Sequence, residues 1–285
     1  MTQPYAHVIG DPIAHSKSPL IHSFWLEKLG IAGRYKARHV EPAGLGEYLD
    51  RQRTDGNWIG CNVTMPHKQA IMAHLDHLDP DAERLGAVNT VVRQENGALK
   101  GFNTDAPGFL EPLLSILKTQ HLFRMARIIG TGGAARAIIA VLADNGFTLV
   151  VTGRNPDKAR AMLDELAPGG EHHAVALPHF AQPTDFAFDD RENCLDLVIN
   201  ASPLGMNGAP PLKFDWSHAP PGSIAYDIVT DPAETEFLTG AKAAGHPVID
   251  GYSMLIGQAA TAFEKFFGVH PPREYDAELR ELLLS

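Results

Sequence analysis

The stretch Gly130-Thr131-Gly132-Gly133-Ala134-Ala135 follows the strand-like residues Arg127–Gly130 and leads into a helical pattern over Ala134–Asn145. Glycines allow a sharp turn between strand and helix, and they let the backbone approach a pyrophosphate. The first N–H groups of the helix and its dipole favour an anion at that end. Gly146 suits the position just past the helix. The stretch predicts a dinucleotide-binding βα unit, which its flanks favour over a merely flexible turn.

The next strand candidate ends in a sequence that predicts which dinucleotide is bound. Thr148–Val151 leads into Thr152-Gly153-Arg154-Asn155, where no carboxylate is present. An NAD site would place Asp or Glu about 20 residues after the glycines, to bind the ribose 2′-hydroxyl. The guanidinium of Arg154 can instead pair with a 2′-phosphate through two hydrogen bonds. NADP is therefore the predicted cofactor, and the alternative is that Arg154 is a solvated surface charge.

The second half of the chain alternates strands and helices, which predicts a parallel sheet covered on both faces. A helix is expected over Pro156–Leu166, and the polar stretch Gly169–Arg191 is expected to be an irregular loop. The strand candidates are Arg127–Gly130, Thr148–Thr152, Leu195–Ala201, Ser223–Ile228 and Pro247–Asp250.

The first half alternates less regularly. Asn96-Gly97, between strand-like segments over Ala87–Arg93 and Ala98–Phe102, predicts a type I′ hairpin and hence a mixed sheet. The other expected elements are strands at Tyr5–Ile9, Tyr35–Val40 and Trp58–Val63 and helices at Pro19–Leu29 and Glu47–Arg53.

An amphipathic helix is expected over Ser253–Phe267, returning the chain to its first domain. The predicted fold is thus α/β with two domains and an active site in the cleft between them. A mixed-sheet substrate domain spans 1–104 and 248–285, and a Rossmann-like NADP-binding domain spans 105–247.

Composition limits the classes of partner. The 285 residues are 44% hydrophobic and 20% charged, with a formal net charge of −10, which argues against nucleic acid or an anionic membrane. No apolar run approaches the ~20 residues of a membrane span, and the first residues lack signal-peptide features. Cys61 and Cys194 are expected to be core or near-core thiols, and the histidine spacing does not indicate a metal site. We expect a cytoplasmic protein, monomeric or homodimeric, that binds a small-molecule substrate.

Polar clusters occur where α/β proteins place ligands, at the ends of strands. Together they would suit a small polyhydroxylated molecule, and reducing a ketone also needs a proton donor, for which Lys68 and Asp105 are the candidates. Individually they have simpler explanations: Ser16 and Ser18 could cap a helix, and a Lys–Asp pair is often only a surface ion pair. The clusters are Ala14–Pro19, Asn62–Lys68, Gly86–Thr90 and Gly101–Asp105.

In order along the chain, these motifs resemble those of the shikimate dehydrogenase family over nearly the whole length. Further matching motifs are Asn200–Met206, Tyr226-Asp227 and Gly251–Gln258. The resemblance implies NADPH-dependent reduction of 3-dehydroshikimate to shikimate, in aromatic amino-acid biosynthesis.

The resemblance also implies roles for individual residues. Lys68 and Asp105 would be catalytic, with Lys68 as the main acid/base group. Substrate contacts would come from Ser16, Ser18, Thr64, Asn89, Asp105, Tyr226 and Gln258. The cofactor would be held by Gly130, Gly132, Gly133, Ala134, Arg154, Lys158, Met206, Gly251 and Met254.

Some residues depart from the family pattern, so alternatives remain. Where the family usually has Asn-Arg-Thr, this chain has Gly153-Arg154-Asn155, so we expect its preference for NADP to be weaker than is usual in the family. One alternative is a quinate/shikimate dehydrogenase with NAD preference, which Arg154 and Lys17 argue against. A non-catalytic ligand sensor on the same fold is another, opposed by the retention of Lys68 and Asp105. A folate-linked dehydrogenase is opposed by the serine cluster.

Overall fold

The computed structural model describes residues 3–185, 188 and 192–285. The chain forms two compact units. Unit 1 consists of Met1–Gly108 and Ile256–Ser285, and unit 2 consists of Phe109–Leu255. The second division falls inside helix α9 (Gly251–Phe267), so this helix begins in one unit and ends in the other.

Unit 1 contains a six-stranded mixed sheet. Its strand order is β2 (Arg34–His39), β1 (Tyr5–Gly10), β3 (Trp58–Val63), β5 (Thr90–Arg93), β6 (Leu99–Phe102) and β4 (His77–Leu78). Strand β5 is antiparallel to both of its neighbours, and the other adjacent pairs are parallel. The mixed sheet predicted for the first domain is confirmed. Strands β1, β3 and β6 therefore end at the edge where β5 begins.

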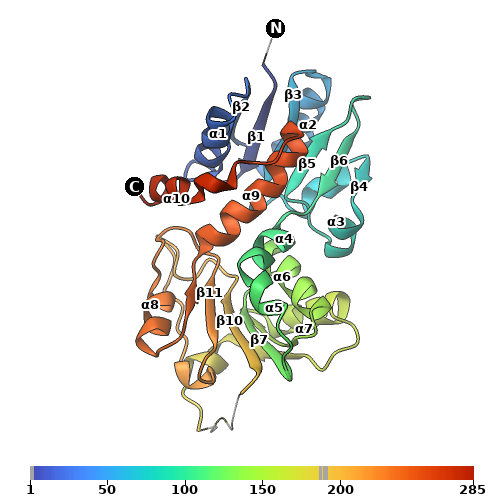
Figure 1. The fold of residues 1–285 in the computed structure, drawn as a ribbon. Coiled ribbons are helices and arrows are strands. Elements are labelled where there is room, and N and C mark those ends of the chain that lie inside the picture. Colours follow the sequence, from blue (N-terminus) through green and yellow to red (C-terminus); the bar gives the residue numbers. More distant parts are fainter. Residues whose placement is uncertain (1–2, 186–187, 189–191) are drawn as a thin grey trace. The chain divides into compact units, whose positions relative to one another are not determined.

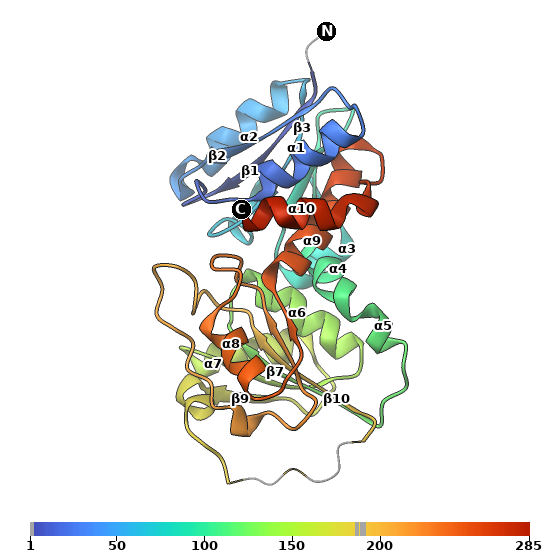
Figure 2. The ribbon, with the colours of Figure 1, turned by 60° about the vertical axis from the view of Figure 1, so that its left-hand side comes forward.

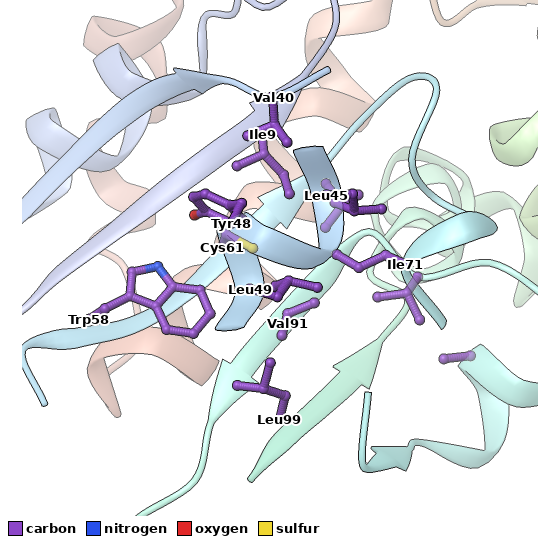
Figure 3. Close-up of a cluster of buried hydrophobic side chains, with 13 residues drawn as sticks. Ile9, Val40, Leu45, Tyr48, Leu49, Trp58, Cys61, Ile71, Val91 and Leu99 are labelled. Carbon is purple, nitrogen blue, oxygen red and sulfur yellow. The ribbon is translucent and has the colours of Figure 1, made fainter. Parts of the chain in front are cut away.

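Alternate residues of β1 face opposite sides of this sheet, as strand geometry requires. Ile9 packs with Leu45 and Leu49 of α2 (Leu45–Thr54), in the buried cluster drawn in Figure 3. Val8 packs on the other side with Phe266 of α9. Helix α1 (Ser18–Lys28) lies on the side of β1 away from α2 (Figure 2). Both faces of the sheet are therefore covered, which explains why its central strands are apolar.

The hairpin between β5 and β6 forms, but its predicted type I′ turn is wrong. Gly97 donates its N–H to the Gln94 carbonyl, and Gln94 donates to the Ala98 carbonyl. Gly97 has φ +84°, whereas Asn96 is not among the residues with positive φ. A type I′ turn needs positive φ at both central residues, so this is a type I turn followed by a glycine bulge. In the expected turn Asn96 and Gly97 would be the two central residues. In the structure Glu95 and Asn96 are central, and Gly97 follows them as the bulge residue.

Unit 2 contains a parallel sheet of six strands. Their order is β12 (Val248–Ile249), β11 (Ile224–Asp227), β10 (Cys194–Asn200), β7 (Phe123–Ile129), β8 (Thr148–Gly153) and β9 (His173–Ala176). The chain starts in the middle, builds outward through β8 and β9, and then returns to build the other half. This is the doubly wound dinucleotide-binding order, with its switch point between β7 and β10. The predicted parallel, Rossmann-like sheet is confirmed.

The helices of unit 2 cover this sheet. Helices α6 (Gly133–Asp144) and α7 (Pro156–Leu166) pack against β7, β8 and β9, whereas α8 (Glu236–Ala243) packs against β11 and β12 (Figure 1). Asn145 is the C-cap of α6, and Gly146 follows just past the helix with φ +75°, as the sequence predicted.

The prediction of an irregular loop over Gly169–Arg191 is wrong in part. Strand β9 and a 3₁₀ helix over Leu177–Ala181 lie inside it. Residues 186–187 and 189–191 lie outside the described residues. Strand β9 is at the sheet edge and none of its side chains is buried, so it lacks the apolar run by which a central strand is recognised.

The remaining elements are short or terminal. The helices are α3 (Pro80–Leu85), α4 (Asp105–Leu110), α5 (Leu114–Leu117) and α10 (Asp276–Leu284). The other 3₁₀ turns are Pro42–Gly44, Ala70–His74, Glu111–Leu113, Trp216–His218 and Arg273–Tyr275. Cys61 is buried as expected, and both cysteines are free thiols. Within the described ranges, no helix is long and apolar enough to cross a membrane, and no group of His, Cys, Asp or Glu is placed to hold a metal ion.

Candidate active site

Lys68 and Asp105 form an ion pair in unit 1. The Lys68 Nζ lies 2.5 Å from Asp105 Oδ2, and the two side chains are 16% and 6% exposed. The backbone carbonyl of Lys68 accepts a hydrogen bond of 2.7 Å from Val88 N–H, which ties its loop to the start of the hairpin. This pair is largely removed from solvent, unlike the exposed ion pair that was its alternative interpretation.

Asn89 fixes the other oxygen of Asp105. Its Nδ2 donates to Asp105 Oδ1 at 2.9 Å, and its Oδ1 accepts the backbone N–H of Thr104 at 2.7 Å. Asp105 N–H in turn donates to Asn103 Oδ1 at 3.0 Å. Asn89, Thr104 and Asp105 are all buried. Three of the predicted residues, Lys68, Asn89 and Asp105, are thus in direct hydrogen-bond contact.

Sheet topology explains why residues so far apart in sequence meet here. Lys68 follows the end of β3, Asn89 precedes the start of β5, and Asp105 follows the end of β6. Because β5 runs opposite to β3 and β6, these three positions lie at the same edge of the sheet. The antiparallel hairpin therefore brings Asn89 and Asp105 close to Lys68.

The two predicted serines lie at the same edge, after β1. Lys17 is the N-cap residue of α1, and no side chain caps this helix. The Ser16 hydroxyl accepts only a long hydrogen bond of 3.4 Å from Ser18 N–H, so the capping explanation for the pair is not supported. Ser18 is buried, whereas Ser16 is half-buried.

Thr64 lies beside the loop that carries these serines. A Cβ added to Gly10 would lie 2.5 Å from Thr64 Cγ2 and 2.9 Å from the Met65 carbonyl oxygen. The ends of β1 and β3 therefore approach so closely that only glycine fits at position 10. Thr64 itself is half-buried.

Gln258, the last predicted substrate residue of unit 1, lies on α9. The helix α4 that begins at Asp105 packs closely on α9, because a Cβ at Gly108 would lie 2.4 Å from Gln258 N. His67, next to the predicted catalytic lysine, is buried and its Nε2 lies 2.6 Å from the Val40 carbonyl oxygen. This bond anchors the loop that carries Lys68.

The glycine loop of unit 2 has the features that a pyrophosphate site needs. Gly130 has φ +133°, and a Cβ there would lie 2.4 Å from the Ala201 carbonyl oxygen. A Cβ on Gly132 would meet no atom within 4 Å, so this residue borders open space. Gly132 is the N-cap of α6 and offers no side chain to the first N–H groups of the helix. These residues therefore fit a dinucleotide whose phosphates would accept those N–H groups.

The end of β8 carries the residues predicted to choose between NADP and NAD. Arg154 and Lys158 are exposed. Asn155 caps α7, because its Oδ1 accepts from Asp157 N–H at 2.9 Å. A Cβ at Gly153 would lie 2.9 Å from Thr131 Cγ2, so the small residue at 153 accommodates the threonine of the glycine loop. Gly153 thus leaves room for Thr131 and Asn155 caps α7, while Arg154 between them is exposed.

Two buried polar residues shape the loop that follows β10. Asn200 Nδ2 donates to the Leu204 carbonyl at 2.8 Å and to Asp227 Oδ1 at 3.0 Å. Asp227 also accepts from Thr235 Oγ1 at 2.7 Å, and burial is the main cause that raises its pKa above the ordinary value. Met206, at the end of this loop, is 38% exposed.

Gly251 and Met254 are at the start of α9, and Gly251 packs against the segment that follows strand β11. A Cβ at Gly251 would lie 2.2 Å from the Val229 carbonyl oxygen, so glycine is required there. Met254 is buried.

Tyr226 is fully buried at the end of β11, and its ring stacks on Phe109 with centroids 4.7 Å apart. No group among the described residues hydrogen-bonds to its hydroxyl. Burial, with the carboxylates of Asp250 and Glu111 adding to it, raises the pKa of this phenol. A buried hydroxyl without a partner is uncommon, because it carries the full cost of desolvation.

The sequence motifs gave no role to several residues that hydrogen-bond in the network around Asn89. Thr90, Thr104 and Tyr35 received no role, although they belong to the polar network around Asn89. Thr90 and Thr104 lie within the quoted motifs, so their position was a signal. Tyr35 had a weaker signal, as the one aromatic residue in a strand of otherwise exposed side chains.

Comparisons with known proteins agree with these features. The model of the shikimate dehydrogenase substrate binding domain matches residues 8–91, and that of the shikimate 5′-dehydrogenase C-terminal domain matches residues 251–278. The NADP(+) shikimate dehydrogenase of Sphingopyxis alaskensis is 45% identical over 284 residues, covering 99% of this chain and 97% of the relative.

Solved structures match over the same length. Shikimate 5-dehydrogenase from Thermus thermophilus, in complex with NADP(H) and shikimate, has a TM-score of 0.82 at 37% identity, covering 99% of this chain and 100% of that one. Quinate dehydrogenase from Corynebacterium glutamicum, in complex with NAD, has a TM-score of 0.83 at 31% identity, with 99% of both chains covered. The resemblance seen in the sequence motifs is confirmed, and this chain belongs to the shikimate dehydrogenase family.

Proposed function

We propose that this protein catalyses the reversible, NADPH-dependent reduction of 3-dehydroshikimate to shikimate in aromatic amino-acid biosynthesis. The observation that carries the proposal is the largely buried Lys68–Asp105 pair, held in place by Asn89. A carbonyl reduction needs a proton donor that stays in one position, and this arrangement supplies one.

In the reduction, the bound nicotinamide supplies the hydride that attacks the carbonyl carbon. The Lys68 ammonium gives a proton to the carbonyl oxygen, and solvent returns a proton to the amine. Asp105 holds the lysine through Oδ2, while Asn89 keeps its carboxylate from rotating. In the oxidation of shikimate, the neutral lysine takes the hydroxyl proton instead.

The substrate would be bound by hydroxyl and amide side chains. Ser16 and Ser18 are proposed to bind its carboxylate, and Thr64, Asn89 and Gln258 its ring hydroxyls. Tyr226 is proposed to join the serines. This role is supported by its unpartnered hydroxyl, which would gain an acceptor when substrate binds.

The cofactor would be held by unit 2. Gly130, Gly132, Gly133 and Ala134 are proposed to lie against the pyrophosphate, with Arg154 and Lys158 at the 2′-phosphate and Met206, Gly251 and Met254 near the nicotinamide. The open space beside Gly132 and the exposed guanidinium of Arg154 support this assignment. Because a 2′-phosphate occurs only in NADP, we expect NADP to be preferred over NAD.

The proposal is tested by steady-state oxidation of shikimate and of quinate, each with NADP and with NAD. Activity concentrated on shikimate with NADP is expected. Comparable rates with quinate or NAD would favour the quinate/shikimate alternative, whose relative in Corynebacterium glutamicum was solved with NAD. No turnover with any pair would favour a ligand sensor.

A further inference from the structure

A chain of buried polar groups leads from the Lys68–Asp105 pair deep into unit 1 and ends at Tyr35. This tyrosine is on edge strand β2, opposite Ala6 of β1, and its side chain is the one buried in that strand. Asn62 is on β3, opposite Val8 of β1. Since Ala6 and Val8 share a face, the Tyr35 ring can reach Asn62 across the central strand. The Tyr35 hydroxyl lies 2.5 Å from Asn62 Oδ1.

Backbone groups fix the orientation of both amides in this chain. The Thr104 N–H can only donate, so the atom of Asn89 that faces it must be Oδ1. Asn89 Nδ2 must then face Asp105 as a donor. The backbone carbonyl oxygen of Asn89 can only accept, so the atom of Asn62 that faces it at 3.2 Å must be Nδ2. Asn62 Oδ1 is left to accept from Tyr35.

The hydroxyl of Thr90 connects the two amides. It accepts from Asn62 Nδ2 at 3.0 Å and donates to Asn89 Oδ1 at 3.0 Å. Every donor in the series therefore points from Tyr35 toward Asp105. The Asp105 carboxylate ends the chain as an acceptor at Oδ1, which leaves Oδ2 for Lys68.

Tyr35 is held firmly enough to act as the anchor of this chain. Its ring stacks on His22 with centroids 3.9 Å apart and planes within 2°, and it is 4% exposed. Burial raises the pKa of the Tyr35 phenol well above its ordinary value, which keeps the hydroxyl protonated as the donor to Asn62.

We propose that Tyr35 is a positioning residue for the acid/base pair. Through Asn62, Thr90 and Asn89 it fixes the carboxylate of Asp105. The catalytic part of this inference rests on the proposed function. The hydrogen-bond part can be tested without turnover, because it concerns side chains of the free protein.

The test compares Tyr35→Phe with Tyr48→Phe. Tyr48 is a matched control in the same unit: it is also buried, and its hydroxyl lies 2.9 Å from His7 Nδ1, outside the polar chain. Tyr35→Phe leaves Asn62 Oδ1 buried without its donor, so Asn62 and Asn89 are free to shift. We expect kcat for shikimate oxidation to fall about tenfold, since small displacements of acid/base groups cost rate. Affinity for NADP should be unchanged, and Tyr48→Phe should leave kcat within about twofold.

Two further measurements separate positioning from general damage. In an Asn62→Ala background, Tyr35→Phe should cause almost no further loss of kcat, since both act through one chain. NMR of the side-chain amides should show the Asn89 resonance shifted in Tyr35→Phe and unchanged in Tyr48→Phe.

The outcomes distinguish this inference from the function. An inactive wild type would overturn the proposed function, while the Asn89 resonance would still decide the role of Tyr35. An active wild type with an unchanged kcat and an unchanged Asn89 resonance in Tyr35→Phe would overturn the positioning role. Equal losses of kcat in the two tyrosine variants would also overturn it.

Discussion

Replacing Lys68 by alanine removes the proposed proton donor and leaves its partners in place. Asp105 keeps the hydrogen bond from Asn89 at Oδ1 but loses its contact at Oδ2. The described side chains that form the hydrogen-bonded chain from Tyr35 to Asn89 are all neutral, so that chain offers no second cation to replace the lysine. The lost function should therefore not be recovered by rearrangement within the network.

Two losses are expected, one in kcat and one in the free energy of unfolding. General acid–base catalysis contributes about 10² to 10⁴ in rate. A loss of kcat of at least about 100-fold, or roughly 2.7 kcal/mol of transition-state stabilisation, is expected. The free energy of unfolding should fall by about 1–3 kcal/mol, less than for a fully buried pair, because Asp105 retains Asn89 and Lys68 is partly exposed.

The assay measures kcat for shikimate oxidation, the dissociation constant for NADP, and urea unfolding for Lys68→Ala. Lys36→Ala, an exposed lysine on β2, is the matched control and should leave all three unchanged. Nucleotide affinity should stay within about twofold in Lys68→Ala, since the loss lies in the acid/base step. An unchanged kcat in a folded Lys68→Ala protein would refute the assignment.

Three further changes probe cofactor binding and stability. Arg154→Ala should weaken NADP by about 10-fold or more while changing NAD less than twofold, because the lost contact is a charge-assisted pair to the 2′-phosphate; equal losses in binding titrations would make Arg154 structural. Gly130→Ala should lower the free energy of unfolding by roughly 2 kcal/mol or more, given φ +133° and the 2.4 Å contact with Ala201. Gly132→Ala should instead keep the stability and lose NADP affinity. Similar urea midpoints for the two glycine variants would contradict this expectation. Burial lowers the pKa of His22 to about 3 in the folded state, so its contribution to stability is present above its ordinary pKa and is lost as pH falls toward 3. Between about pH 7 and 5, wild type should lose about 2 kcal/mol more than His22→Phe in urea unfolding; parallel pH profiles would show that His22 is not buried as the neutral ring.

The nucleotide unit could be predicted from sequence because its signals are local. The glycine run, the apolar strands β7 and β8 and the helix over Pro156–Leu166 each combine turn chemistry, burial and capping within a few residues. Asn155 followed by Pro156 is a start signal that the structure bears out, since Asn155 caps α7.

Features that depend on tertiary context could not be predicted in the same way. Strand β9 is stabilised by pairing with β8 at the sheet edge, which its own half-polar sequence does not encode. The contact between Tyr35 and Asn62 spans a third strand, so no spacing along the chain indicates it. The turn at Gly97 shows a further limit, because Asn-Gly fits more than one hairpin geometry.

The proposed function is tested most directly by the forward reaction of the purified protein with 3-dehydroshikimate and NADPH. NADPH consumption is followed by absorbance, and the product is identified by NMR. We expect one shikimate to form for each NADPH oxidised, and turnover to be lost in Lys68→Ala. Binding of both ligands without NADPH consumption by the wild type would contradict the proposed function.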